Sequence, residues 1–113
     1  MKTITGTALR ALLAQKSTLL DDLEEVIGDL DLRDLAFHSL ILENIRFKGN
    51  VDFGDVEVDN ARIINCIIEG EVRGSITYKE IYVIHPFIWY WDNYCEKTLA
   101  SSQVAEFFAQ EGY

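Results

Sequence analysis

The sequence predicts a mainly β protein whose chain winds into stacked coils, and two observations support this fold class. The first is a long repeat. Residues 28–32 (GDLDL) return as residues 49–53 (GNVDF), and residues 70–72 (GEV) begin a third copy, so the copies start 21 residues apart. A fixed period of this size is typical of solenoids, in which one unit cannot bury its apolar face alone and must stack on the next.

The second observation is a finer pattern inside each copy, where apolar pairs two residues apart recur every five residues. The pairs are Leu30/Leu32, Leu35/Phe37, Leu40/Leu42, Ile45/Phe47, Val51/Phe53, Val56/Val58, Ala61/Ile63 and Cys66/Ile68. Residues i and i+2 of an extended segment point to the same side, so each pair is predicted to face inward. Each copy then forms a coil with four short sides, and the coils stack about 4.8 Å apart.

Four of these segments, residues 30–32, 51–53, 56–58 and 61–63, resemble the motif of pentapeptide-repeat proteins. That motif is a small residue, then Asp or Asn, then Leu or Phe, then two polar residues. Ile41 and Ile67 depart from it, because they stand where the family has a polar residue. The resemblance implies a right-handed quadrilateral β-helix of two to three coils over residues 28–84.

Residues 1–27 are predicted to cap the first coil, which would otherwise expose apolar side chains and unpaired backbone groups. Residues 7–15 are strong helix formers, and Thr5 or Thr7 is available as the N-cap. Two alternatives stay open for residues 18–27. Their apolar spacing fits a second helix, but the repeat run backwards aligns Val26 with Phe47 and favours a degenerate half coil.

The coils are predicted to end near residue 84. The third copy keeps Val72 in place and then falls two residues short of the pattern, although later apolar pairs can still face inward. Those pairs are Ile76/Tyr78 and Ile81/Val83. Pro86 ends the run, because proline has no amide hydrogen for a strand ladder.

Residues 85–113 combine an aromatic segment with a predicted terminal helix that begins at Thr98 or Ser102 and ends at Gln110. The aromatic side chains concerned are Trp89, Tyr90, Trp91, Tyr94, Phe107 and Phe108. Two uses of them are open. They could form a lid over the last coil, or an exposed surface that binds a partner or a second copy of the chain.

Composition limits the functions that this chain can have. A chain of 113 residues with 49% hydrophobic residues is predicted to fold as one domain, and we expect it in the cytoplasm without membrane contact. Cys66, a predicted core residue, and Cys95 form neither a disulfide framework nor a metal motif. His38 is predicted to face outward beside Asp59 of the next coil, and His85 to lie in a turn. We therefore expect no enzyme activity, no cofactor and no metal.

Acidic residues are predicted to gather on two of the four sides, which cover residues 29–38 and 50–59. These sides carry seven carboxylates against Arg33 alone, a net −6, whereas the other two sides carry +1. The seven are Asp29, Asp31, Asp34, Asp52, Asp55, Glu57 and Asp59. Stacking puts Asp31 over Asp52, and like charges directly opposite across strands are destabilising. Partner binding, solubility and a calcium column are three explanations of this pattern.

Some pentapeptide-repeat proteins mimic duplex DNA and occupy a topoisomerase or another DNA-binding protein. The resemblance and the acidic sides together predict an inhibitor of a nucleic-acid-binding protein, such as a topoisomerase, a nuclease or a defence complex, that acts through these seven carboxylates. The net charge of −9 argues against direct binding of nucleic acid. The alternative is an immunity-like or antitoxin-like protein, or a scaffold, that binds its partner through the aromatic C-terminal surface.

Overall fold

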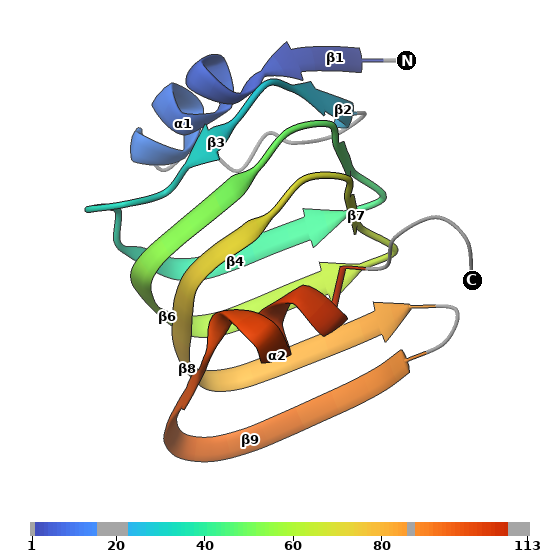
Figure 1. Cartoon of the computed structure of the whole chain (residues 1–113). Coiled ribbons are helices and arrows are strands. Elements are labelled where there is room, and N and C mark those ends of the chain that lie inside the picture. The colour runs from blue at the N-terminus through green and yellow to red at the C-terminus, as the bar shows by residue number, and fades with distance from the viewer. Residues whose placement is uncertain (1, 16–22, 86–87, 109–113) are drawn as a thin grey trace.

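Strands dominate the structure, a computed structural model that describes residues 2–15, 23–85 and 88–108 (Figure 1). The elements in chain order are β1 (Lys2–Thr5), α1 (Gly6–Ala14), β2 (Leu23–Ile27), β3 (Leu30–Asp31), β4 (Phe37–Glu43), β5 (Arg46–Phe47), β6 (Val51–Ile64), β7 (Ile67–Ile68), β8 (Val72–His85), β9 (Ile88–Leu99) and α2 (Ser101–Glu106). One sheet has the order β1-β2-β5-β7. The other has the order β3-β6-β8-β9, with β4 also beside β6. The mainly β expectation is confirmed, with two short helices in the described residues.

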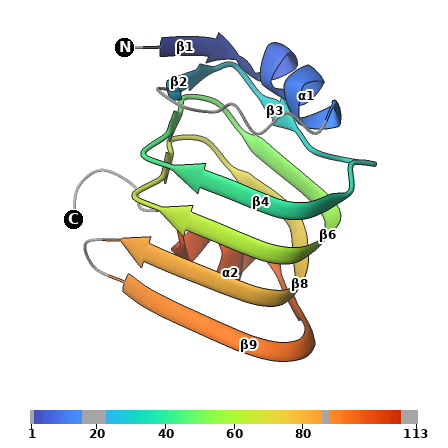
Figure 2. The ribbon, with the colours of Figure 1, turned by 180° about the vertical axis from the view of Figure 1, so that it is seen from behind.

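Successive copies of the sequence repeat lie side by side through parallel pairing (Figure 2). Leu30 pairs with Val51, and Val51 pairs in turn with Val72. Strands β5 and β7 pair with the same offset, Phe47 against Ile68. The period of 21 residues in the sequence is therefore the spacing between hydrogen-bonded neighbours.

The third copy is one residue short of the pattern, which corrects the predicted shortfall of two. The pairing of β6 with β8 shifts by one residue after Asp52, so that Val56 lies beside Ile76. The new offset continues to the end of β8. Because only one residue is lost, at a bulge in the ladder, the later pairs of β8 return to the inner face.

The predicted inward pairs form the core. Every member of the eight pairs is buried except Leu35 and Phe37, which are half-buried and pack against the core. Strand β8 adds Ile76, Tyr78, Ile81 and Val83, all fully buried. Strand alternation therefore placed the core side chains correctly, and only the corner between β3 and β4 is looser than predicted.

Glycine recurs at the start of the second and third copies because the backbones approach closely there. A Cβ atom on Gly49 would lie 2.5 Å from the carbonyl oxygen of Gly28, and one on Gly70 would lie 2.5 Å from that of Gly49. Contacts this short leave no room for a side chain. Stacking thus requires glycine at these two positions, whereas Gly28 has open space around it and a φ of +81°, which favours glycine for the backbone conformation.

Helix α1 follows the prediction closely. It begins after Thr5, whose Oγ1 accepts a hydrogen bond of 3.1 Å from the backbone N–H of Ala8, as expected of an N-cap. Leu9 and Leu13 are buried beneath it. The helix contacts β3, so it covers that end of the stack (Figure 1).

Residues 23–27 form a strand, β2, and not a second helix. Val26 pairs in parallel with Phe47, the alignment obtained by running the repeat backwards. On its other side β2 pairs with β1, a strand that the sequence analysis did not predict. Residues 18–22 of the ambiguous stretch lie outside the described residues.

The aromatic segment forms a strand that the sequence analysis also missed. Strand β9 pairs with β8 in the antiparallel direction, with Trp89 beside Ile84 and Trp91 beside Tyr82. Helix α2 is shorter than predicted. Phe108 follows it and packs into the core, with its ring centroid 6.2 Å from that of Phe47. Within the described residues, neither helix has the length and apolar character needed to span a membrane.

Candidate interaction surfaces

Asp31 and Asp52 lie side by side, as the stacking predicted, but both carboxylates shape the backbone. Asp31 Oδ1 accepts a hydrogen bond of 2.9 Å from the N–H of Arg33, and Asp52 Oδ1 accepts one of 2.8 Å from the N–H of Gly54. An aspartate that bonds the amide two residues ahead stabilises a turn. The repeated aspartate of the sequence motif is therefore part of a corner of the fold.

Arginine side chains offset the repulsion expected between these two carboxylates. Arg33 Nη2 lies 2.9 Å from Asp31 Oδ2, and Arg33 Nε lies 3.9 Å from Asp52 Oδ2. Arg10, which comes from α1 and was not counted on the acidic sides, donates a hydrogen bond of 2.6 Å to the carbonyl oxygen of Asp31. Mainly through the hydrogen bond from Arg33, the pKa of Asp31 falls to about 2.

Asp29 and Asp55 also have partners. Asp29 Oδ1 accepts a hydrogen bond of 2.9 Å from the N–H of Asn50, and Asn50 Oδ1 accepts one of 2.8 Å from the N–H of Glu71. This ladder explains why Asp or Asn follows the first two glycines of the repeat. Asp55 accepts a hydrogen bond of 3.0 Å from Ser75 Oγ.

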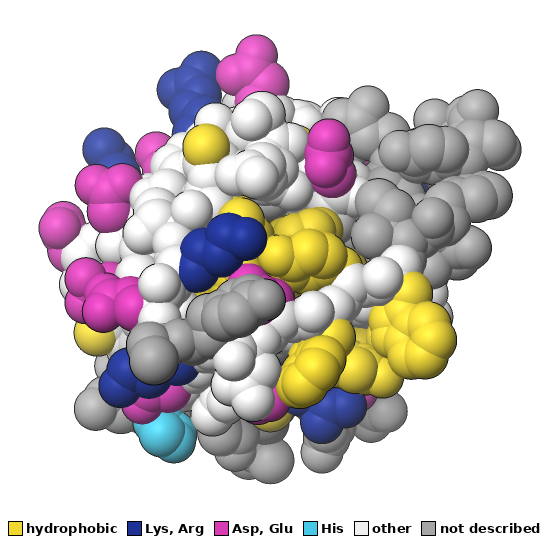
Figure 3. Space-filling model, turned by 90° about the horizontal axis from the view of Figure 1, so that it is seen from below, with side chains coloured by type: hydrophobic (Ala, Val, Ile, Leu, Met, Phe, Trp, Pro, Cys, Tyr) yellow, Lys and Arg dark blue, Asp and Glu magenta, His cyan; other side chains and the backbone are white. Residues whose placement is uncertain are grey.

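Asp59 lies between His38 and Lys79. Its Oδ2 is 2.7 Å from His38 Nδ1, which confirms the predicted neighbour, and its Oδ1 is 3.4 Å from Lys79 Nζ. Hydrogen bonding to His38 and then to Lys79 lowers the pKa of Asp59. Among the described residues, only Asp34 and Glu57 of the seven predicted acids have neither a salt bridge nor a side-chain hydrogen bond. Figure 3 shows acidic and basic side chains interspersed along one side of the molecule.

The six predicted aromatic residues separate into two groups. Phe107 and Phe108 are buried, and the half-buried Tyr90 ring stacks on Phe107 with 5.2 Å between centroids. Trp89 and Trp91 point outward, 78% and 59% exposed. The side chain of Tyr94 lies outside the described residues. The aromatic residues therefore serve in part as core side chains and in part as an exposed surface.

Buried polar contacts hold β9 on β8. The Asp92 carboxylate, 5% exposed, accepts a hydrogen bond from the hydroxyl of Tyr78 and a longer one, 3.5 Å, from that of Tyr90. Lys97 Nζ lies 3.9 Å from the same carboxylate. Burial, with the Asp92 hydrogen bond as a second cause, raises the pKa of the Tyr78 hydroxyl. These bonds orient β9 so that the tryptophans face outward.

The outward tryptophans belong to a larger surface, which we call the aromatic face. It runs across β4, β6, β8 and β9 in two rows of paired residues. One row is Ile41, Arg62, Tyr82 and Trp91, and the other is Glu43, Ile64, Ile84 and Trp89. Sequence reasoning missed all of these except the tryptophans. The signal was present, however, because Ile41 is an apolar residue at an outward position of the motif.

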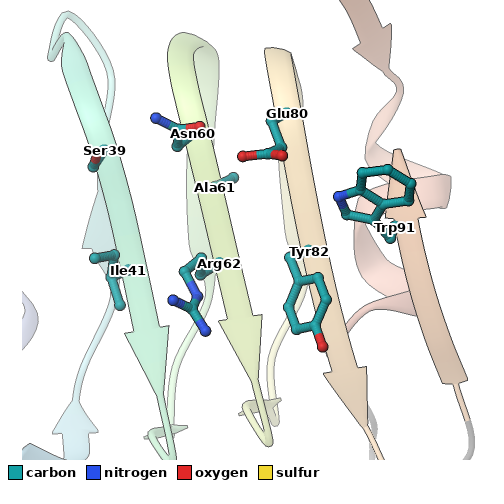
Figure 4. Close-up of a pocket in the computed structure, with 8 residues that line it drawn as sticks. All are labelled: Ser39, Ile41, Asn60, Ala61, Arg62, Glu80, Tyr82 and Trp91. Atoms are coloured by element: carbon teal, nitrogen blue, oxygen red, sulfur yellow. The ribbon is translucent and has the colours of Figure 1, made fainter. Parts of the chain in front are cut away.

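A groove of about 440 Å³ crosses this face (Figure 4). Its lining residues are Ser39, Ile41, Asn60, Ala61, Arg62, Glu80, Tyr82 and Trp91. The Arg62 guanidinium lies over the Tyr82 ring, 5.7 Å from its centroid. The described residues place no salt bridge on Glu80, so its charge is available to a bound molecule.

Cys66 is buried, and burial raises the pKa of its thiol to about 11, so the reactive thiolate is scarce. Within the described ranges, no group of three His, Cys, Asp or Glu side chains could hold a metal ion. Comparison with protein-family models, curated proteins and solved structures found no match to this chain.

Proposed function

We propose that this protein is a protein-binding module that docks its partner on the aromatic face. The observation that carries the proposal is the exposure of Trp89 and Trp91 at the end of two continuous outward rows. Tryptophan, tyrosine and arginine supply most of the binding energy in protein interfaces, and this face presents all three. The immunity-like, antitoxin-like and scaffold alternatives of the sequence analysis all belong to this class.

The charge of the molecule favours a basic partner. The chain carries a net −9, which attracts positively charged surfaces over a long range and repels acidic ones. On the face itself, Glu43 and Glu80 stand among the apolar side chains. We therefore propose a partner whose surface combines apolar residues with Lys or Arg.

Quantitative capture of partners from the native host tests this proposal. The Ile41→Ser/Arg62→Ala variant changes two exposed residues of the face and leaves β9 intact, so it should fold normally and lose most of the partner. The matched control is Asp34→Asn/Glu57→Gln, which changes the two acids without a described polar contact. Retention of the partner by the first variant and its loss from the control would overturn the proposal.

DNA mimicry is the second candidate, and the free carboxylates favour it. Asp34 and Glu57 form no salt bridge among the described residues, and Asp55 is bound only by a hydroxyl. We propose that these three, with the four partnered acids, occupy a basic groove of a nucleic-acid-binding protein. DNA should then compete for the partner, and binding should weaken steeply with salt. Binding that neither DNA nor salt affects excludes mimicry.

For the architecture, we propose a right-handed quadrilateral β-helix of the pentapeptide-repeat type over residues 28–84. The parallel offset of 21 residues and the burial of the i, i+2 pairs support it. The antiparallel β9 then ends the β-helix. A crystal structure with the opposite handedness between β3 and β6 would refute this assignment.

We also propose that the C-terminal segment forms a homodimer. Strand β9 is the last strand of its sheet and pairs only with β8 among the described residues, so its outer edge is available to another strand. Mass measurement in solution tests this. Trp91→Lys, which places a charge beside the edge, should leave a monomer, and an unchanged mass for this variant would contradict pairing through β9.

A further inference from the structure

We infer that the groove on the aromatic face holds an arginine side chain of the partner, between Glu80 and Trp91. This inference rests on the proposed function and assigns the chemistry of its central contact. The two residues come from neighbouring strands, because Glu80 pairs with Asn93 and Tyr82 with Trp91. Figure 4 shows the Trp91 ring extending from β9 toward β8, and the Glu80 carboxylate extending from the other side of β8 toward Asn60, so that a bound side chain would cross β8 to contact both.

The aromatic face already contains one contact between an arginine side chain and an aromatic ring. The guanidinium of Arg62 lies 5.7 Å from the centre of the Tyr82 ring, within the range of a cation–π interaction. Trp91 is the next aromatic residue of the row, and tryptophan is the strongest π partner for a cation. Its indole is 59% exposed. One aromatic position of the row is thus occupied by the protein's own cation, and the next is open.

Glu80 supplies the matching negative charge. It is half-buried in the groove, and the described residues give it no salt bridge. A carboxylate that is partly removed from water attracts a cation more strongly than one in bulk solvent. Ser39 and Asn60 line the same groove and can hydrogen bond the backbone of the bound segment.

Arginine fits this pair better than lysine does. Its planar guanidinium stacks on an indole and donates two parallel hydrogen bonds to a carboxylate, whereas an ammonium group acts as a point charge. The groove of about 440 Å³ has the volume of a small ligand site, which suits one long side chain with its adjoining backbone. The net charge of −9 adds long-range attraction for the cationic segment.

A titration with two synthetic peptides tests the inference without knowledge of the partner. One is the blocked peptide Gly-Ser-Arg-Ser-Gly, and the other has citrulline, the neutral isostere, in place of arginine. The readout is the NMR signal of the indole N–H groups. The arginine peptide should move the Trp91 signal with millimolar affinity and leave that of Trp89 in place. The citrulline peptide should bind about fivefold to tenfold more weakly.

Variants complete the test. Glu80→Gln should weaken binding of the arginine peptide by a similar factor, whereas Glu43→Gln, which changes an exposed glutamate on the same face, should not. Equal binding of the two peptides, equal effects of the two variants, or an unmoved Trp91 signal would each overturn the inference. If partner capture still depended on Ile41 and Arg62, the proposal of a protein-binding module would be retained, and only the proposed arginine contact would be refuted.

Discussion

The acidic sides and the aromatic face share strand β6, but their side chains differ in how many contacts they make within the chain. On the acidic sides most carboxylates have a partner within the chain, as Asp31 does with Arg33 and Asp59 with His38 and Lys79. On the aromatic face, Trp89 and Trp91 stand largely in solvent. The acidic residues are easy to see in the sequence, but most of their carboxylates are bound within the chain. The residues of the exposed apolar surface come from segments that are distant in the sequence.

The comparison shows why residue type alone is a weak guide to a binding surface. A carboxylate that accepts backbone N–H groups, as Asp52 does, stabilises the fold, and it has less capacity left for a partner. An exposed tryptophan contributes little to the stability of the fold, but its apolar surface can be buried when a partner binds, which stabilises the complex. Substitutions at the two kinds of side chain should therefore differ in their effect on stability.

The largest effect is expected from the core that both surfaces share. Phe53 is 1% exposed, and Phe53→Asp would bury an unpaired charge at a cost that exceeds the whole stability of a small domain, roughly 5–15 kcal/mol. We expect no cooperative thermal unfolding by circular dichroism. Asp55→Asn, two residues away and exposed, is the control and should melt normally. A soluble, cooperatively melting Phe53→Asp protein would refute the assigned core.

A smaller effect distinguishes fold-stabilising acids from surface acids. Asp52→Ala removes the acceptor for the Gly54 N–H and should lower the free energy of unfolding by about 1–2 kcal/mol. Glu57→Ala removes an exposed carboxylate without a described contact and should stay within about 0.5 kcal/mol of the wild type. Urea titration measures both. Equal effects would mean that the corner role assigned to Asp52 is mistaken.

The Asp31 carboxylate should make the stability of the protein depend on pH. Its pKa in the folded protein is about 2, below the ordinary value of 3.8, so its contribution to stability is present above pH 4 and is lost as the pH falls toward 2. The effect should be modest, because the side chain is 42% exposed. Arg33→Ala should flatten this part of the stability curve, measured by urea unfolding from pH 2 to 5. An unchanged curve would show that Arg33 does not stabilise the Asp31 carboxylate.

The smallest effect on stability is expected on the aromatic face. Trp89 is 78% exposed, so Trp89→Ser should change the free energy of unfolding by less than about 0.5 kcal/mol. Phe107→Ser, at the buried end of the same segment, is the contrast and should cost several times more. A loss above about 1 kcal/mol in Trp89→Ser would mean that Trp89 stabilises the fold and is not reserved for a partner.

Much of the fold could be predicted from the sequence, because strand alternation and a fixed period are local patterns. The i, i+2 pairs identified the core, the glycine period identified the parallel offset, and Thr5 and Thr7 were the two candidates for the N-cap of α1, of which the structure uses Thr5. Strand β9 was not predicted from the sequence. Its inward residues, Tyr90 and Asp92, are polar or amphipathic, and they become buried only because Tyr78 on β8 offers a partner.

The sequence by itself determined which side chains face inward and how far apart stacked neighbours lie, since both follow from the geometry of an extended chain. Only the tertiary structure decided which charges meet and which apolar residues join on the surface. Arg10 reaches Asp31 from a helix, and the row from Ile41 to Trp91 forms across four strands. Such contacts join residues that are distant in sequence, and pairing register alone brings them together.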